Sequence, residues 1–152
     1  MDYKYIPLSE LKDNRIRAVK LNRIIDGDTI DFYIDQGFSQ GFYDRARLYR
    51  LNTPEKRGTE AVAGKWVHQK VIDWVGEDTT LWLHSLVWDR DRYGRILADV
   101  YNQKGECLNA YLLLNNYAWP TDEIGTIIGQ RDINRLKLPT EIINQVLISQ
   151  RN

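Results

Sequence analysis

The sequence has almost no cysteine and no excess of charge. Cys107 is the only cysteine among 152 residues, so the chain cannot form an internal disulfide or a cysteine-rich metal site. We therefore expect stability to come from packing, with Cys107 as a small core residue. The 21 basic and 21 acidic residues cancel, which argues against a protein that coats nucleic acid through bulk electrostatics. Any surface that binds a polyanion must therefore be local.

Long apolar runs are also missing. No segment approaches the roughly 18 apolar residues of a membrane span. The opening MDYKYIPLSEL lacks the stretch of roughly 7–15 apolar residues that a secretory signal needs. We therefore expect no membrane contact, a cytoplasmic location for the chain as it stands, and secretion only if a leader has been removed. The chain has 152 residues, about the length of one domain, and its prolines are scattered with no visible repeat, so we expect a single domain over residues 1–152. We also expect a monomer.

Hydrophobic periodicity predicts a mixture of strands and helices. Alternating apolar and polar residues predict five strands, at 16–25, 29–34, 43–51, 81–88 and 95–101. Thr59 is the expected N-cap of a long helix, and a second and third helix are expected at 109–114 and after a cap at Thr140. Residues 121–138 have no clear pattern. The apolar stripe of the long helix comprises Ala63, Trp66, Val67, Lys70, Val71, Trp74 and Val75.

This order of elements predicts an α+β fold that is mainly β. Helices follow only the third and fifth predicted strands, which disfavours a parallel sheet built from alternating βα units. We expect a five-stranded Greek-key barrel of OB type with about three helices, one between strands 3 and 4 and the others after strand 5. Barrels of this type bind oligonucleotides on one side, so the architecture suggests nucleic acid as a partner by analogy.

Three charged clusters fall where the barrel would have turns or strand ends. The first is Asp26-Gly27-Asp28-Thr29, in which two carboxylates flank a glycine and could present hard oxygen ligands to a divalent cation. Asp and Gly are also ordinary turn residues. Read alone, this cluster therefore decides nothing.

The second cluster surrounds Arg47 and Glu55. Arg47 shares a face of its predicted strand with Arg45, so at least one of the two must face solvent or serve a site. A guanidinium grips phosphate with two parallel donors. Glu55, just past the turn at Pro54, could position or deprotonate a water. Read alone, the stretch is equally typical of an edge strand followed by a solvated loop.

The third cluster, residues 89–95, places three arginines and two aspartates around one predicted turn. Read alone, it is typical of a self-neutralising surface hairpin. The chain offers little other chemistry. His68 and His84 have no second histidine at ligand spacing, and Trp66 and Trp74 fit sheet packing better than base stacking, so we expect all four to be structural.

Together the three clusters resemble the thermonuclease (staphylococcal nuclease-like) family. The motifs DGDT, RLxxxNTPE and DRYGR occur in that order over residues 16–119, which leaves 120–152 as a C-terminal extension. The resemblance implies a Ca²⁺ site at Asp28, Asn52 and the Thr53 carbonyl, with Asp26 in a supporting shell. It also assigns catalytic roles to Arg47, Glu55 and Arg95, and contacts with nucleotide phosphate and base to Arg92 and Tyr93.

The function implied by this resemblance is that of a calcium-dependent nuclease. It would hydrolyse phosphodiester bonds of DNA and/or RNA, leave 3′-phosphate ends and need no cofactor beyond the metal. Asn52 stands where the family has a second metal carboxylate. Losing that charge should cost at least a couple of kcal/mol of calcium binding, although Asp26 or Asp44 could compensate. The family's nucleotide-stacking tyrosine also has no obvious counterpart near Tyr117 and Trp119.

The alternative is a catalytically inactive OB-fold module that binds nucleic acid or a protein, which Asn52 would mark. Arg47, Glu55 and Arg95 count against it, because a glutamate among phosphate-binding arginines would repel the ligand of a pure binder.

Overall fold

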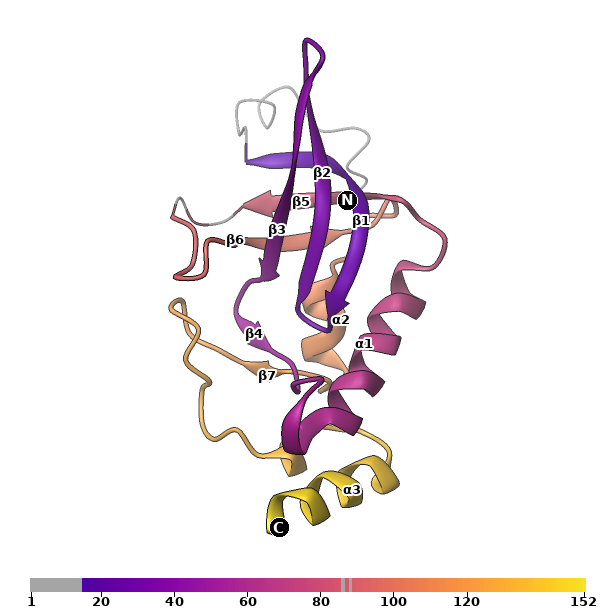
Figure 1. Cartoon of the computed structure of the whole chain (residues 1–152), viewed down its shortest axis with the longest axis vertical. Helices are drawn as coiled ribbons and strands as arrows, with labels where there is room; N and C mark the ends of the chain where they lie inside the picture. Colours follow the sequence, from indigo (N-terminus) through magenta and orange to yellow (C-terminus); the bar gives the residue numbers. More distant parts are fainter. Residues whose placement is uncertain (1–14, 86, 88) are drawn as a thin grey trace.

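A closed five-stranded barrel forms the centre of the protein, as expected (Figure 1). The computed structural model describes residues 15–85, 87 and 89–152. The opening residues 1–11, where no secretory signal is expected, and residues 86 and 88 of the predicted strand 81–88 lie outside these residues. The barrel strands are β1 (Ile16–Asp26), β2 (Thr29–Gly37), β3 (Gln40–Leu48), β5 (Thr80–Ser85) and β6 (Ile96–Tyr101).

The strands pair in the order β1-β2-β3-β6-β5, with β5 closing on β1. Neighbours are antiparallel except β3 and β6, which run parallel with Ala46 opposite Ile96. A parallel pair cannot be joined by a hairpin, and here a helix and β5 lie between its two strands in the sequence. Alternate residues point inward and are buried, including Ile30, Phe32, Leu81 and Val100.

The long helix α1 (Ala61–Val75) buries the small apolar residues of the predicted stripe, while Lys70 is only partly buried. Ala63, Val67, Val71 and Val75 are buried, while Trp66 and Trp74 pack at the edges of the core. The predicted N-cap at Thr59 is wrong, because a 3₁₀ turn, η3 (Gly58–Glu60), precedes the helix and no side chain caps it.

The two remaining described helices are α2 (Leu108–Leu114) and α3 (Thr140–Arg151). The cap predicted at Thr140 is also wrong, because the Pro139 carbonyl accepts hydrogen bonds from the amides of Ile142 and Ile143 instead. Cys107 is half-buried at the start of α2 rather than a member of the core. No helix in the described part of the chain is long and apolar enough to span a membrane.

A small second sheet below the barrel was not predicted (Figure 1). The expected strand 43–51 stops at Leu48, because Arg50 has a left-handed backbone (φ 63°) and turns the chain. The next residues form β4 (Leu51–Asn52), which pairs with β7 (Trp119–Pro120).

Residues after β7 fold back onto this sheet. A turn brings Thr121 opposite Ile127, and a second 3₁₀ turn, η4 (Ile133–Arg135), follows. The core beneath the barrel contains the buried side chains of Trp119, Ile133, Leu136, Leu138 and Val146. Residues 120–152 therefore share the hydrophobic core of the barrel.

Candidate functional site

An open cleft of about 1010 Å³ lies between the end of the barrel and the small sheet. All the predicted site residues line this cleft except Thr53, which is buried. The structure therefore brings three distant parts of the sequence to one place. The predicted residues at the cleft are Asp26, Asp28, Arg47, Asn52, Glu55, Arg92, Tyr93 and Arg95.

Asp28 occupies the turn between β1 and β2 and is only 5% exposed. Its Oδ1 accepts a hydrogen bond from the Thr29 hydroxyl (3.1 Å), and its Oδ2 accepts one from the Thr53 amide (3.0 Å). Gly27 makes this approach possible, because a Cβ there would lie 2.9 Å from Thr53 Oγ1. The DGDT turn is thus shaped to press one carboxylate against the loop that carries Thr53.

Asp26 and Asp28 form a crowded acidic pair. Asp26 Oδ1 accepts a hydrogen bond from the Asp28 amide (3.0 Å). Burial, followed by repulsion from Asp28, raises the pKa of Asp26 to about 7. Burial also acts to raise the pKa of Asp28, but the Arg47 guanidinium and hydrogen bonds from Asp26 and Thr53 outweigh it, so that pKa lies below its usual value. A proton or a cation bound beside the two carboxylates would reduce the repulsion between them.

Arg47 stands opposite Thr29 in the β2–β3 ladder and reaches into the acidic pair. Its Nη2 is 3.1 Å from Asp28 Oδ2 and donates to Asn52 Oδ1 at 3.0 Å. Its Nε is buried and has no hydrogen-bond partner. It is the one buried side-chain polar atom in this condition among the described residues. Leaving a buried donor unpaired costs about 1–3 kcal/mol, so each such group needs an explanation, such as strain, an ordered water or a catalytic role. Arg45, on the same face, instead pairs with Asp31 at 2.6 Å and is largely exposed.

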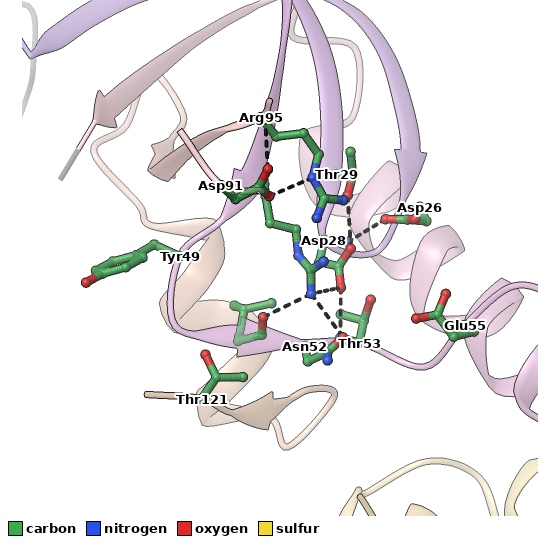
Figure 2. A network of polar contacts seen from close by, with 12 residues as sticks. Asp26, Asp28, Thr29, Tyr49, Asn52, Thr53, Glu55, Asp91, Arg95 and Thr121 are labelled. Atoms are coloured by element: carbon green, nitrogen blue, oxygen red, sulfur yellow. Dashed lines mark hydrogen bonds and ion pairs between the residues drawn. The ribbon is translucent and has the colours of Figure 1, made fainter. Parts of the chain in front are cut away.

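Arg95 is held by the loop between β5 and β6. Asp91 Oδ1 accepts hydrogen bonds from the amides of Tyr93 and Arg95 (both 2.9 Å), and Asp91 Oδ2 accepts one from Arg95 Nε (2.8 Å). Gly94 allows the tight turn with φ 79°. Figure 2 shows Arg95 above Asp28, with Asp91 on one side of its guanidinium and Thr29 on the other.

Tyr93 and Arg92 form the outer rim of the cleft. The Tyr93 ring is 67% exposed, with the guanidinium carbons of Arg92 and Arg95 each 5.0 Å from its centre. Asp44, which was expected as a possible replacement for the charge missing at Asn52, does not line the cleft. It pairs with Arg90 at 2.7 Å and lines a neighbouring depression rather than the cleft. Asp26 is therefore the acid that stands beside Asp28.

The oxygen atoms at this site are of the types that bind a hard divalent cation. Carboxylates of Asp26 and Asp28, the Asn52 amide oxygen and the Thr53 carbonyl are the donor types that calcium prefers. Arg47 and Arg131 already donate to the last two oxygens, but a carbonyl oxygen keeps a second lone pair. Within the described ranges, no three His, Cys, Asp or Glu side chains gather into a group able to hold a metal.

Glu55 follows Pro54 on the loop between β4 and α1. Its side chain is 67% exposed, and its amide donates to Glu60 Oε1 (2.9 Å). Helix α1 lies so close that a Cβ at Gly64 would overlap the Glu55 carbonyl. Figure 2 shows Glu55 to one side of Asp28, beyond Thr53. The carboxylate is therefore exposed to solvent while its backbone amide is held by Glu60.

Two groups that shape this site were not predicted from the sequence. Arg131 and Glu60 form an ion pair (2.7 Å) behind the Thr53–Glu55 loop. Neither could be found from local patterns, since they are 71 residues apart and Arg131 lies in the unassigned segment. By contrast, the spacing of Asp91 and Arg95 around a glycine turn was a readable signal for their pairing.

Comparison with known proteins gives a family and two relatives. A family model described as staphylococcal nuclease homologue matches residues 45–133. The chain is 30% identical over 104 residues to an uncharacterized endonuclease of Escherichia coli, a match that covers 68% of this chain and 61% of the relative. It is 29% identical over the same length to an uncharacterized endonuclease of Escherichia coli O157:H7. The chain thus spans about three fifths of the length of these curated relatives.

Proposed function

The chain belongs to the family of staphylococcal nuclease homologues, and on this basis we propose that it is a calcium-dependent nuclease that hydrolyses phosphodiester bonds of DNA and/or RNA. The observation that carries the proposal is the convergence of Asp28, Arg47, Glu55 and Arg95 on one cleft. Cleavage between phosphorus and the 5′ oxygen would leave 3′-phosphate ends.

The two arginines are suited to bind the phosphate that reacts. Arg47 is fixed by Asp28 and Asn52, and Arg95 is fixed by Asp91. Donors held in place before the reaction stabilise charge that grows on the equatorial phosphate oxygens in the transition state. Arg92 and Tyr93 would contact the adjoining nucleotide.

Glu55 is suited to orient the attacking water and accept its proton, because its exposed carboxylate lines the same cleft. Asp28, Asn52 and the Thr53 carbonyl would hold Ca²⁺, with Asp26 supporting them. When bound, the ion would supply Lewis-acid polarisation of the phosphate.

One observation favours the alternative of an inactive binding module. The Asn52 amide oxygen is directed at Arg47, so the position that would complete a metal site serves to hold an arginine instead. Such a module would bind single-stranded nucleic acid through the arginines and leave it intact.

A digestion assay decides between the two. We expect the purified protein to degrade denatured DNA or RNA in millimolar calcium and to stop when a chelator is added. Magnesium and manganese should be tested in parallel, with Glu55→Gln as the control for a contaminating nuclease. Binding of a labelled oligonucleotide without cleavage in any of the metals would support the module.

A further inference from the structure

Arg131 was not among the predicted site residues, yet it contacts Glu60 and the backbone of Thr53. Its Nε and Nη2 donate to the two carboxylate oxygens of Glu60 at 2.9 and 2.7 Å. Nη2 also donates to the Thr53 carbonyl at 3.2 Å. The guanidinium carbon lies 4.5 Å from the centre of the Trp119 ring. The Glu60 carboxylate, the Thr53 carbonyl and the Trp119 ring together hold the guanidinium in place.

Arg131 and Glu60 together hold both ends of the segment that leads to Glu55. Arg131 binds the Thr53 carbonyl, and Glu60 Oε1 accepts the hydrogen bond from the Glu55 amide (2.9 Å). The Thr53 amide is held separately by Asp28. Removal of Arg131 would therefore release the carbonyl side of Thr53 and loosen Glu60, while the anchor at Asp28 stays in place.

We propose that Arg131 is a positioning residue that sets the backbone of residues 53–55 and thereby directs the Glu55 carboxylate at the cleft. The proposal rests on the nuclease function proposed above. Arg131 does not line the cleft, so it acts through the loop rather than on substrate. Its Nη2 also lies 3.7 Å from Glu55 Oε1, so Arg131 contacts the Glu55 side chain as well as the Thr53 backbone.

The size of the effect follows from the geometry of the reaction. Misplacing a reacting group by about 1 Å can cost on the order of 10²-fold in rate. Substrate binding by the arginines of the barrel would be unaffected, because Arg47 and Arg95 are held by other partners. The loss should therefore appear in kcat rather than in KM.

The test compares Arg131→Gln and Arg131→Lys with Arg135→Gln. Arg135 is a matched control, because it lies in the same segment, is exposed and donates to the carbonyls of Gln130 and Ile128. We expect Arg131→Gln to lower kcat by on the order of 10²-fold with KM nearly unchanged. Arg131→Lys should recover part of the rate, since it keeps the charge and one donor. Arg135→Gln should keep the wild-type kcat.

A second readout does not depend on activity. Hydrogen–deuterium exchange should accelerate in peptides covering residues 53–57 of Arg131→Gln and stay unchanged in the barrel strands. An unchanged kcat, unchanged exchange in this loop, an equal loss in Arg135→Gln, or unfolding of both Arg131 variants would overturn the proposal. If the wild-type protein cleaves nothing, the nuclease function fails, while the exchange result still decides whether Arg131 holds the loop.

Discussion

The two walls of the cleft hold their charged side chains in different ways. In the barrel wall (residues 26–28, 47 and 89–95), Asp91 pairs with Arg95 within one turn, and Arg47 reaches Asp28 across the β2–β3 hairpin. Longer contacts also occur there, from Arg90 to Asp44 and from the Thr53 amide to Asp28. In the opposite wall (residues 51–60 and 119–131), partners are far apart, with Arg131 lying 78 residues from Thr53. The barrel wall is set by local turns, and the opposite wall depends on how the chain returns to the barrel.

This difference predicts different consequences of substitution. Arg95 in the barrel wall pairs with Asp91 within one loop, so its loss should affect rate more than stability. Groups behind the opposite wall join two distant segments, so their loss should affect both. Glu55 is the exception in that wall, because its side chain is exposed while its backbone is held.

Glu55→Gln gives the largest expected effect. We expect the cleavage rate to fall by about 10²–10⁴-fold, the usual contribution of a general base. Unfolding free energy should change by less than about 0.5 kcal/mol, as for other exposed positions. Glu123→Gln is the control, since Glu123 lines the same cleft and is 75% exposed. Single-turnover rates and urea unfolding measure the two quantities. Equal rates for both variants would remove Glu55 from the mechanism.

Arg95→Gln tests the barrel wall itself. We expect the rate to fall by about 10²–10³-fold, the usual cost of one donor to transition-state charge. Stability should fall by no more than about 1 kcal/mol, because the pair with Asp91 is partly solvated. Arg45→Gln provides the comparison, because Arg45 forms an ion pair outside the cleft. If stability fell in step with rate, Arg95 would belong with the structural ion pairs.

The sequence was sufficient for the parts of the fold in which a local pattern repeats. Alternation in β2 and the apolar stripe of α1 both buried the expected faces. The caps at Thr59 and Thr140 were wrong because short-range propensity competes with neighbouring groups. A 3₁₀ turn precedes α1, and its Glu60 pairs with Arg131. At α3, the Pro139 carbonyl accepts hydrogen bonds from amides of the first turn.

The candidate site divides in the same way. Residues of the barrel wall, and Asn52, Thr53 and Glu55 of the opposite wall, could be named because three motifs together resemble a known family, although none of them decides a role alone. The pair β4–β7 could not be predicted, since two residues per strand carry no periodicity. Arg131 could not be predicted either, since nothing near it in sequence indicates a contact with Glu60.

Asn52→Asp tests whether Asp28 and residue 52, which both line the cleft, can hold a cation. The change restores a carboxylate beside Asp28, and we expect calcium to bind more tightly by about 2 kcal/mol, or roughly 30-fold. Calorimetric titration with calcium measures this directly. The control is Asn102→Asp, which adds a carboxylate outside the cleft. An unchanged calcium affinity would show that Asn52 only holds Arg47.

Glu60→Gln gives the smallest effect and the one with a pH signature. Burial raises the pKa of Glu60, but the Arg131 guanidinium and the Glu55 amide outweigh it, so the folded-state pKa lies below the usual value. The ionised pair therefore stabilises the fold above the unfolded pKa of about 4.3, and this contribution is lost as pH falls through the folded pKa. We expect Glu60→Gln to cost about 1–2 kcal/mol at pH 7 and progressively less below about pH 4. Urea unfolding across this range measures the difference from the wild type, with Glu123→Gln as the exposed control. A cost that stayed constant down to about pH 3 would mean that Glu60 acts through packing rather than through its charge, and the contrast between the two walls would lose its electrostatic basis.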